Sequence, residues 1–402
     1  MSVFYSTVSR RTFMKNIGLA GAGIGATAAL APSFNDLDEL VSDSQGGQTF
    51  PWWVKQRPLE NPTVEVDWSL MQRFDASKCT NGGKLTQYVS TDKQTEINTI
   101  SSTSLQQWLT EKRPGFTLRD RALQVAPSGV SAAPWTTPKP SFSATGSGVP
   151  NWQGTPEENS RMLRSALKFF GATLIGYTEL TANVKKMIYT KQYSSPWADF
   201  TMENVDLAYE TTTKQVIPMN KQMFIVTVMS PVCLESIKTV PGPLSSRTAT
   251  GNTNNIMAMA FNRVQGFLAS LGYQCICGTQ NGVGSSPAFA AMSGLAEASR
   301  RTDAVSPDFG MAMRAQKFLT DLPLVSTPPI DAGVWRFCGT CKKCADVCPS
   351  GAISFDSQTT WDSPNPWQTP GRKQFAWDGV KCQVQRSYFG GECSLCMGLC
   401  FF

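Results

Sequence analysis

The cysteines of this chain are concentrated near its C-terminal end. Eight of the twelve lie between Cys338 and Cys400, and the other four are scattered between Cys79 and Cys277. Cysteines two or three residues apart rarely form disulfides of good geometry, so this clustering favours metal binding. The chain has no histidine, so any metal site has to use cysteine sulfur. We therefore expect the last part of the chain to be a domain organised around thiolate-bound metal.

The spacing of these cysteines indicates which metal group they bind. The run from Cys338 to Pro349 follows the pattern CxxCxxCxxxCP, which is typical of bacterial ferredoxins with two 4Fe–4S clusters. In such a run the fourth cysteine binds the other cluster. The remaining cysteines have the spacing Cx10CxxCxxxC. The crossing predicts one cluster on Cys338, Cys341, Cys344 and Cys400, and another on Cys348, Cys382, Cys393 and Cys396. Two zinc knuckles are the alternative, which this order fits less well.

The N-terminal residues predict an export signal. Arg10 and Arg11 precede an apolar run rich in glycine and alanine, from Ile17 to Ala31, as in a twin-arginine leader. The run is short for a membrane span, and an ordinary N-terminal helix is the alternative. We expect residues 1–31 to export the folded protein to the outer face of the cytoplasmic membrane, where it would be peripheral.

Composition and patterning divide the rest of the chain. The net charge of +6 falls to about +3 without the three basic residues of the leader, so no nucleic-acid surface is implied. Residues 32–150 are rich in Pro, Ser, Thr and Trp and predict irregular structure wrapped over a core. Residues 151–330 predict an α/β core, followed by the cluster domain at 331–402. Within the core we expect helices at 156–170, 256–271 and 288–298, and strands at 172–176 and 223–229.

Short stretches outside the cysteine segment resemble a known family. They are 51–55, 63–75, 113–120, 154–172, 271–273, 294–297, 306–310 and 320–324. Together with the leader and the two-cluster tail, they resemble the corrinoid-dependent reductive dehalogenases over nearly the whole chain. The family usually continues past its last cluster cysteine, whereas this sequence stops at Phe402, which predicts a shortened or divergent member.

The resemblance implies a fold and a function. The expected fold is α/β (α+β), a nitroreductase-like core that buries a base-off corrinoid, with a C-terminal ferredoxin-like domain. Electrons from a respiratory-chain donor would pass through the outer and inner clusters and reduce cobalt to Co(I). The cobalt would then attack a small organohalide, and halide would leave as a proton is delivered. An exported subunit without its own membrane span would dock on a small membrane anchor protein.

The resemblance also implies site residues. Family members use a tyrosine proton donor, held acidic by an arginine and assisted by an asparagine or lysine. By position the arginine is Arg314 and the amide is Asn281, while the place of the tyrosine is taken by 253–255 (Thr-Asn-Asn). A solvated charge on a helix is the alternative for Arg314. Three aromatic residues, Tyr88, Trp52 and Trp53, are candidates for pocket lining or core packing.

Two other functions compete with this one. An epoxyqueuosine-reductase-like enzyme also pairs a cobamide with two 4Fe–4S clusters, but the leader and the weak net charge argue against a transfer-RNA substrate. A pure iron–sulfur electron carrier would not need the roughly 300 residues that precede Cys338.

Overall fold

The computed structural model describes residues 50–81, 84–126, 130–193, 198–242, 248–277, 282–390 and 393–402. The predicted leader and Asn281 lie outside the described residues. Residues Gln48–Phe402 form one compact unit. No helix in the described part of the chain has the length and apolar character that a membrane crossing requires.

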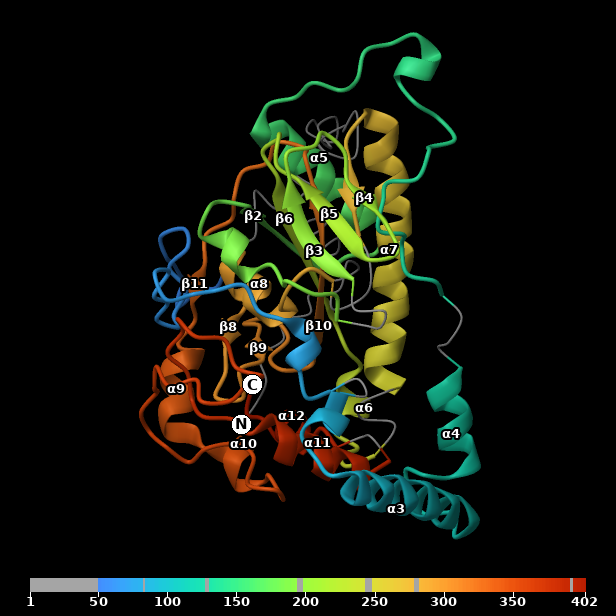
Figure 1. The fold of residues 1–402 in the computed structure, drawn as a ribbon, viewed down its shortest axis with the longest axis vertical. Coiled ribbons are helices and arrows are strands. Elements are labelled where there is room, and N and C mark those ends of the chain that lie inside the picture. The colour runs from blue at the N-terminus through green and yellow to red at the C-terminus, as the bar shows by residue number, and fades with distance from the viewer. Residues whose placement is uncertain are drawn as a thin grey trace, which may run out of the picture. The chain divides into compact units, whose positions relative to one another are not determined.

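A four-stranded antiparallel sheet forms the centre of this unit (Figure 1). Its order is β2 (Leu174–Glu179), β6 (Phe224–Pro231), β10 (Met313–Thr320) and β7 (Cys275–Ile276). β6 is buried from Phe224 to Ser230 because the sheet is covered on both faces. The strand predicted at 223–229 is confirmed, and the one predicted at 172–176 begins two residues later than expected.

Two long helices cover one face of the sheet. They are α5 (Pro156–Phe169) and α7 (Ala249–Leu271), and their apolar residues share one core with alternate residues of the strands, such as Tyr177, Val226 and Phe318. The predicted capping box starts α5, since the Thr155 hydroxyl accepts a hydrogen bond from the Glu158 amide and the Glu158 carboxylate accepts one from the Thr155 amide. The helix predicted at 156–170 is therefore confirmed.

The opposite face packs against shorter elements. These are α8 (Ser286–Met292), η5 (Val184–Met187) and a three-stranded sheet of β3 (Asp199–Glu203), β5 (Lys214–Pro218) and β4 (Tyr209–Glu210). α7 starts seven residues before the predicted 256. The helix predicted at 288–298 is wrong in its second half. The chain leaves the helix at Gly294, which has a φ of 73°, and continues into β8 (Glu297–Ala298). Glycine is required there, because a Cβ would lie 2.1 Å from the Pro328 carbonyl oxygen.

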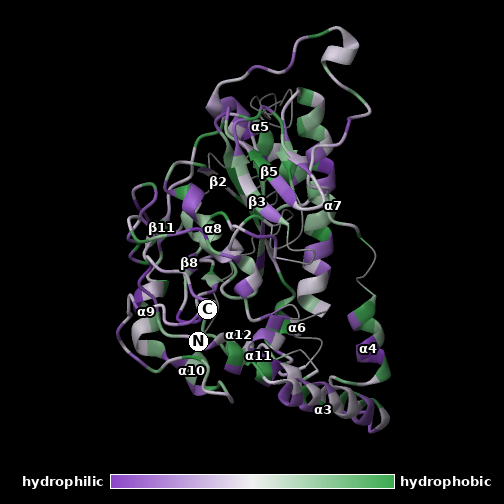
Figure 2. Cartoon of the chain, viewed as in Figure 1, coloured by the Kyte–Doolittle hydropathy of each residue, from purple (hydrophilic) through white to green (hydrophobic). Residues whose placement is uncertain are grey.

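The expectation of irregular structure across residues 32–150 is wrong in part. The segment contains α3 (Thr91–Thr110) and α4 (Leu118–Val125). α3 buries only Ile97, and Figure 2 shows that most of it is polar. It therefore lacks the apolar periodicity by which a helix is recognised. Shorter elements here and in the core are β1 (Lys55–Gln56), which pairs with β11 (Ile330–Asp331), and η2 (Ala76–Lys78), η3 (Lys84–Gln87), η4 (Thr145–Ser147) and α6 (Leu234–Ile237).

The C-terminal part consists of four short helices grouped together (Figure 1). They are α9 (Val334–Cys341), α10 (Lys343–Asp346), α11 (Gly379–Tyr388) and α12 (Leu395–Gly398). Glu297 joins this part to the core, because its carboxylate accepts hydrogen bonds from the amides of Ala332 and Val334 at 2.7 and 2.9 Å. A buried carboxylate at the start of α9 satisfies amides that the helix itself leaves unpaired.

Candidate functional site

The structure gathers the eight C-terminal cysteines into two groups. In the first, burial and the thiols of Cys344, Cys400 and Cys341 raise the pKa of Cys338, to about 11. In the second, burial raises the pKa of Cys396 to about 11, with contributions from the thiols of Cys382 and Cys393 and a smaller one from Cys344 of the first group. The four cysteines of the second group, Cys348, Cys382, Cys393 and Cys396, line one cavity.

Cys348 belongs to the second group, although it lies in the first run of the sequence. Cys348 and Cys393 both contribute to raising the pKa of Cys382 beyond the effect of burial, and Cys348 does the same for Cys393. The grouping by neighbours is thus the same as the crossed pattern expected from the spacing. Whether these residues ligate iron stays a prediction, which the double substitutions described in the Discussion test.

The two CxxC loops that begin α10 and α12 have the same backbone geometry. The residue after the first cysteine has a positive φ in both, 53° at Lys342 and 56° at Ser394. This conformation is uncommon for residues other than glycine. The two CxxC segments therefore share the same uncommon local turn.

Among the residues that the structure describes, no three Cys, Asp or Glu side chains converge closely enough to hold one metal ion. In a cubane each thiolate binds a different iron, so the four sulfurs stand further apart than around zinc. Raised thiol pKa values make ionisation unfavourable without a bound cation, which the positive iron atoms would offset.

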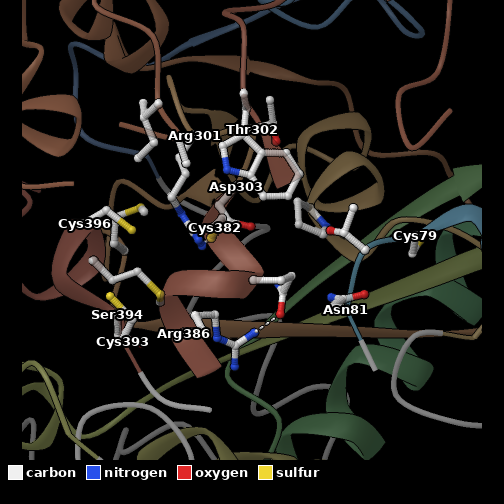
Figure 3. A pocket seen from close by; sticks show the side chains of 18 of the residues that line it. Cys79, Asn81, Arg301, Thr302, Asp303, Cys382, Arg386, Cys393, Ser394 and Cys396 are labelled. Carbon is white, nitrogen blue, oxygen red and sulfur yellow. Dashed lines mark hydrogen bonds and ion pairs between the residues drawn. The ribbon is translucent and has the colours of Figure 1, made fainter. Parts of the chain in front are cut away.

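A cavity of about 480 Å³ lies between the core and the second cysteine group. Figure 3 shows Cys382, Cys393 and Cys396 on one side of it, and Cys79 and Asn81 on the other. The volume is within the range of pockets that hold small molecules or cofactors. The core contributes the start of α8, the first residues of β10, and the side chains of Tyr189 and Tyr193.

Arg314 lines this cavity, as the family resemblance led us to expect. It lies on strand β10, so the alternative of a solvated charge on a helix is wrong. Its Nε donates to the side-chain oxygen of Asn254 at 3.3 Å, and Gln316 donates to the same oxygen at 3.2 Å. Burial and the nearby guanidinium groups of Arg301 and Arg386 lower the pKa of Arg314 to about 10.

The place expected for the tyrosine is thus occupied by an amide that holds Arg314. Tyr193 lies elsewhere on the cavity wall, where its hydroxyl hydrogen-bonds the side chain of Asn81 and the ammonium of Lys84 lies 3.5 Å from its ring centre. Burial raises the pKa of Tyr193, and Arg386 and Arg314 act to lower it. Sequence reasoning missed Tyr193, because nothing in its local pattern distinguishes it from other surface or core tyrosines.

The aromatic residues that we considered for the pocket lie outside it. Trp52 is 90% exposed and Trp53 is 53% exposed, and they contact each other edge to face. They therefore line neither the cavity nor the core. Tyr88 packs on the ring of Trp367, which does line the cavity. Tyr88 therefore contacts a residue of the cavity wall without lining the cavity itself.

Three buried N–H groups on the cavity wall are available to a ligand. They are the Nε of Arg301 and the indole nitrogens of Trp367 and Trp377, and none has a hydrogen-bond partner among the described residues. An unpaired buried donor is costly, so a ligand rich in carbonyl acceptors would satisfy these groups. The amide side chains at the rim of a corrinoid provide acceptors of this kind.

The comparisons with known proteins cover both parts of the chain. Residues 49–147 and 141–324 match the family model described as reductive dehalogenase subunit. Residues 337–402 match the 4Fe–4S double cluster binding domain.

Two relatives from Dehalococcoides mccartyi align along the chain. The chloroethene reductive dehalogenase of strain VS is 32% identical, covering 100% of this chain and 88% of the relative. The trichloroethene reductive dehalogenase of strain ATCC BAA-2266 is 29% identical, covering 99% and 88%.

A solved structure shares the fold. The catabolic reductive dehalogenase NpRdhA in complex with 3-bromo-4-hydroxybenzoic acid matches 86% of this chain with a TM-score of 0.55 and 19% identity, and the chain spans 44% of that protein. The expected α/β fold class with a C-terminal two-cluster domain is confirmed, and so is the resemblance drawn from the sequence. The chain belongs to the reductive dehalogenase family of oxidoreductases and carries a 4Fe–4S double-cluster domain at its C-terminal end.

Proposed function

We propose that this protein removes chlorine from small chlorinated ethenes with the help of a corrinoid. The observation that carries the proposal is the shared cavity, because the second cysteine group, Arg314 and two tyrosines all line it. The substrate class comes from the relatives named for chloroethene and trichloroethene.

The cavity wall fits a corrinoid because it has unpaired hydrogen-bond donors and no histidine. Arg301, Trp367 and Trp377 would hold the amide rim through their unpaired N–H groups. The chain has no histidine, which agrees with a corrinoid that takes no imidazole from the protein. When bound, a reduced corrinoid supplies the cobalt chemistry that breaks a carbon–halogen bond.

The chain's own residues would orient the substrate, exclude water and move the proton. Cys348, Cys382, Cys393 and Cys396 would hold a cluster at the cavity wall, where electrons are needed. Arg314 presents a cation to the cavity, and Asn254 fixes its direction through a hydrogen bond. A buried cation stabilises negative charge that develops on a leaving halide or on a phenolate.

Tyr193 would be the proton donor. A phenol is protonated at neutral pH and so has a proton to give. Burial raises the pKa of Tyr193 and opposes proton release, whereas Arg386 and Arg314 act to lower this pKa and favour the phenolate left after proton release. Tyr193→Phe is expected to lower kcat for dechlorination by roughly 100-fold or more, since a general acid contributes about that much. The measurement is steady-state turnover of trichloroethene with reduced viologen as electron donor.

Tyr88→Phe is the matched control, because Tyr88 contacts Trp367 but does not line the cavity. It should keep near wild-type turnover. Iron and cobalt contents should be unchanged in both variants. Equal turnover in the Tyr193→Phe variant and the wild type would exclude Tyr193 as the donor.

The location and partners form part of the proposal. The arginine pair and apolar run at residues 10–31 support export by the twin-arginine route. The protein would then lie on the outer face of the cytoplasmic membrane, bound to a small membrane anchor protein, and take electrons from the respiratory chain.

The proposed function is tested on protein purified without oxygen. We expect about eight irons and one cobalt per chain, and chloride release from a panel of chlorinated ethenes with reduced viologen. Eight irons without cobalt would favour a pure electron carrier and contradict the proposal. Cobalt without chloride release from any ethene would contradict the substrate class.

A further inference from the structure

The hairpin of β8 and β9 (Ala304–Val305) carries two adjacent arginines at its tip, where it meets the cluster domain. The tip is closed by a hydrogen bond from the Ser299 amide to the Asp303 carbonyl at 2.8 Å. Thr302 has a φ of 64°, which few residues other than glycine adopt. This turn directs Arg300 and Arg301 into the cluster domain, whereas an Arg-Arg pair in the sequence alone suggests an exposed loop.

Arg300 anchors the tip. Its side chain is completely buried and donates to backbone carbonyls of Cys338 at 2.7 and 3.0 Å, Ser354 at 2.8 Å and Asp356 at 2.6 Å. Its guanidinium also lies 4.1 Å from the ring centre of Phe375. The hairpin is thus fixed to the loops around the first cysteine group, and Arg301 beside it is held in place.

Arg301 faces the thiols. It lines the cavity together with all four cysteines of the second group, and 19% of its side chain is exposed. Figure 3 shows it on the side of Cys382 and Cys396, away from Cys79. One end of its guanidinium contacts the carboxylate of Asp303, and its Nε has no partner among the described residues. The thiols that act most strongly on its charge are those of Cys396, Cys382 and Cys344.

A fixed cation at this position affects the reduction of a cluster. A thiolate-bound 4Fe–4S cluster gains one negative charge when it accepts an electron, and nearby charge is one of the determinants of its potential. A buried positive charge stabilises the more negative state, and it does so more strongly than an exposed one because water screens it less. The Asp303 carboxylate offsets part of this effect.

We propose that Arg301 raises the reduction potential of the cluster held by the second cysteine group, and so draws electrons toward the cavity. We call the cluster of the second group, at the cavity, the inner cluster, and that of the first group the outer cluster. The transfer is a one-electron step in which the outer cluster is oxidised and the inner one is reduced. The low-potential donor of the proposed function then reduces the outer cluster again. Arg301 acts on the potential of the cluster and does not itself take part in the dechlorination. The inference rests on the proposed function only in assuming that the electrons are used for dechlorination.

The test is a potentiometric titration of the cluster-loaded protein, followed by electron paramagnetic resonance. Arg301→Gln should shift the midpoint of the inner cluster to more negative values and leave the outer one nearly unchanged. Arg301→Lys keeps the charge and should restore most of the wild-type potential. Arg336→Gln is the matched control, because Arg336 is 71% exposed on α9 and paired with Asp331. The resonance signal that is lost in Cys396→Ala protein identifies the inner cluster.

An unchanged inner potential in Arg301→Gln protein with full iron content would overturn the proposal, and so would a shift confined to the outer cluster. If Arg301→Gln lost iron, Asp303→Asn would decide, since removing the opposing carboxylate should move the inner midpoint to less negative values. No shift there would also overturn the proposal. If the variants show the expected shifts but wild-type protein with full iron and cobalt contents releases no chloride, the proposed function alone is contradicted.

Discussion

Replacing Arg314 with alanine is expected to abolish dechlorination, with kcat at least about 100-fold lower, while iron and cobalt contents stay at wild-type levels. Loss of a single preorganised donor in an active site commonly costs this much. Arg314 is the guanidinium that lines the cavity from strand β10, and Asn254 holds its direction. The measurement is chloride release with reduced viologen, alongside metal analysis of the same preparation.

One further variant separates the charge of Arg314 from its shape, and a second is a control at an exposed arginine. Arg314→Lys keeps the charge but loses the fixed fork that Asn254 orients, so we expect an intermediate rate. Arg119→Ala removes an arginine that is 89% exposed on α4 and should leave turnover unchanged. Wild-type rates in Arg314→Ala protein that retains its metals would remove Arg314 from the reaction.

The crossed arrangement of cysteines leads to the second large effect, which is a loss of iron. Cys348→Ala should remove the inner cluster and lower the iron content from about eight to about four per chain. Cys344→Ala should remove the outer cluster with the same loss. Dechlorination should fall to background in both, because each variant interrupts the path of electrons to the cavity.

Double substitutions distinguish crossed from sequential pairing. If pairing is crossed, Cys348→Ala combined with Cys396→Ala affects one cluster and should still leave about four irons, whereas Cys348→Ala combined with Cys344→Ala should leave almost none. If the first four cysteines shared one cluster, the two results would be exchanged. The exchanged result would contradict the grouping that the thiol neighbours indicate.

The parts of the fold that were predicted correctly depend on local chemistry. The start of α5 follows from Thr155, Pro156 and Glu158, because a capping box is made by residues within one turn. β6 could be recognised because its whole apolar run is buried on both faces. α3 could not be recognised, since a helix that buries only Ile97 has no apolar periodicity.

The candidate site divides in the same way. Arg314 was found by its position within a family pattern, and the structure adds that Asn254 holds it. Tyr193 and Arg301 carry no such pattern. Each lies on the cavity only because distant segments fold together, Tyr193 beyond η5 and Arg301 at the tip of a hairpin.

The sequence by itself determined that this protein belongs with the reductive dehalogenases and carries a two-cluster 4Fe–4S domain, with the last eight cysteines as the predicted ligands, because thiolate spacing and short motifs are local properties. Only the tertiary structure decided which groups face the cavity. A cavity is formed by side chains far apart in the chain, and their charges act on one another only after burial has removed the water between them. Cys348 is an example: it follows Cys344 in the sequence pattern, but in the folded chain it lies with Cys382, Cys393 and Cys396 on the cavity.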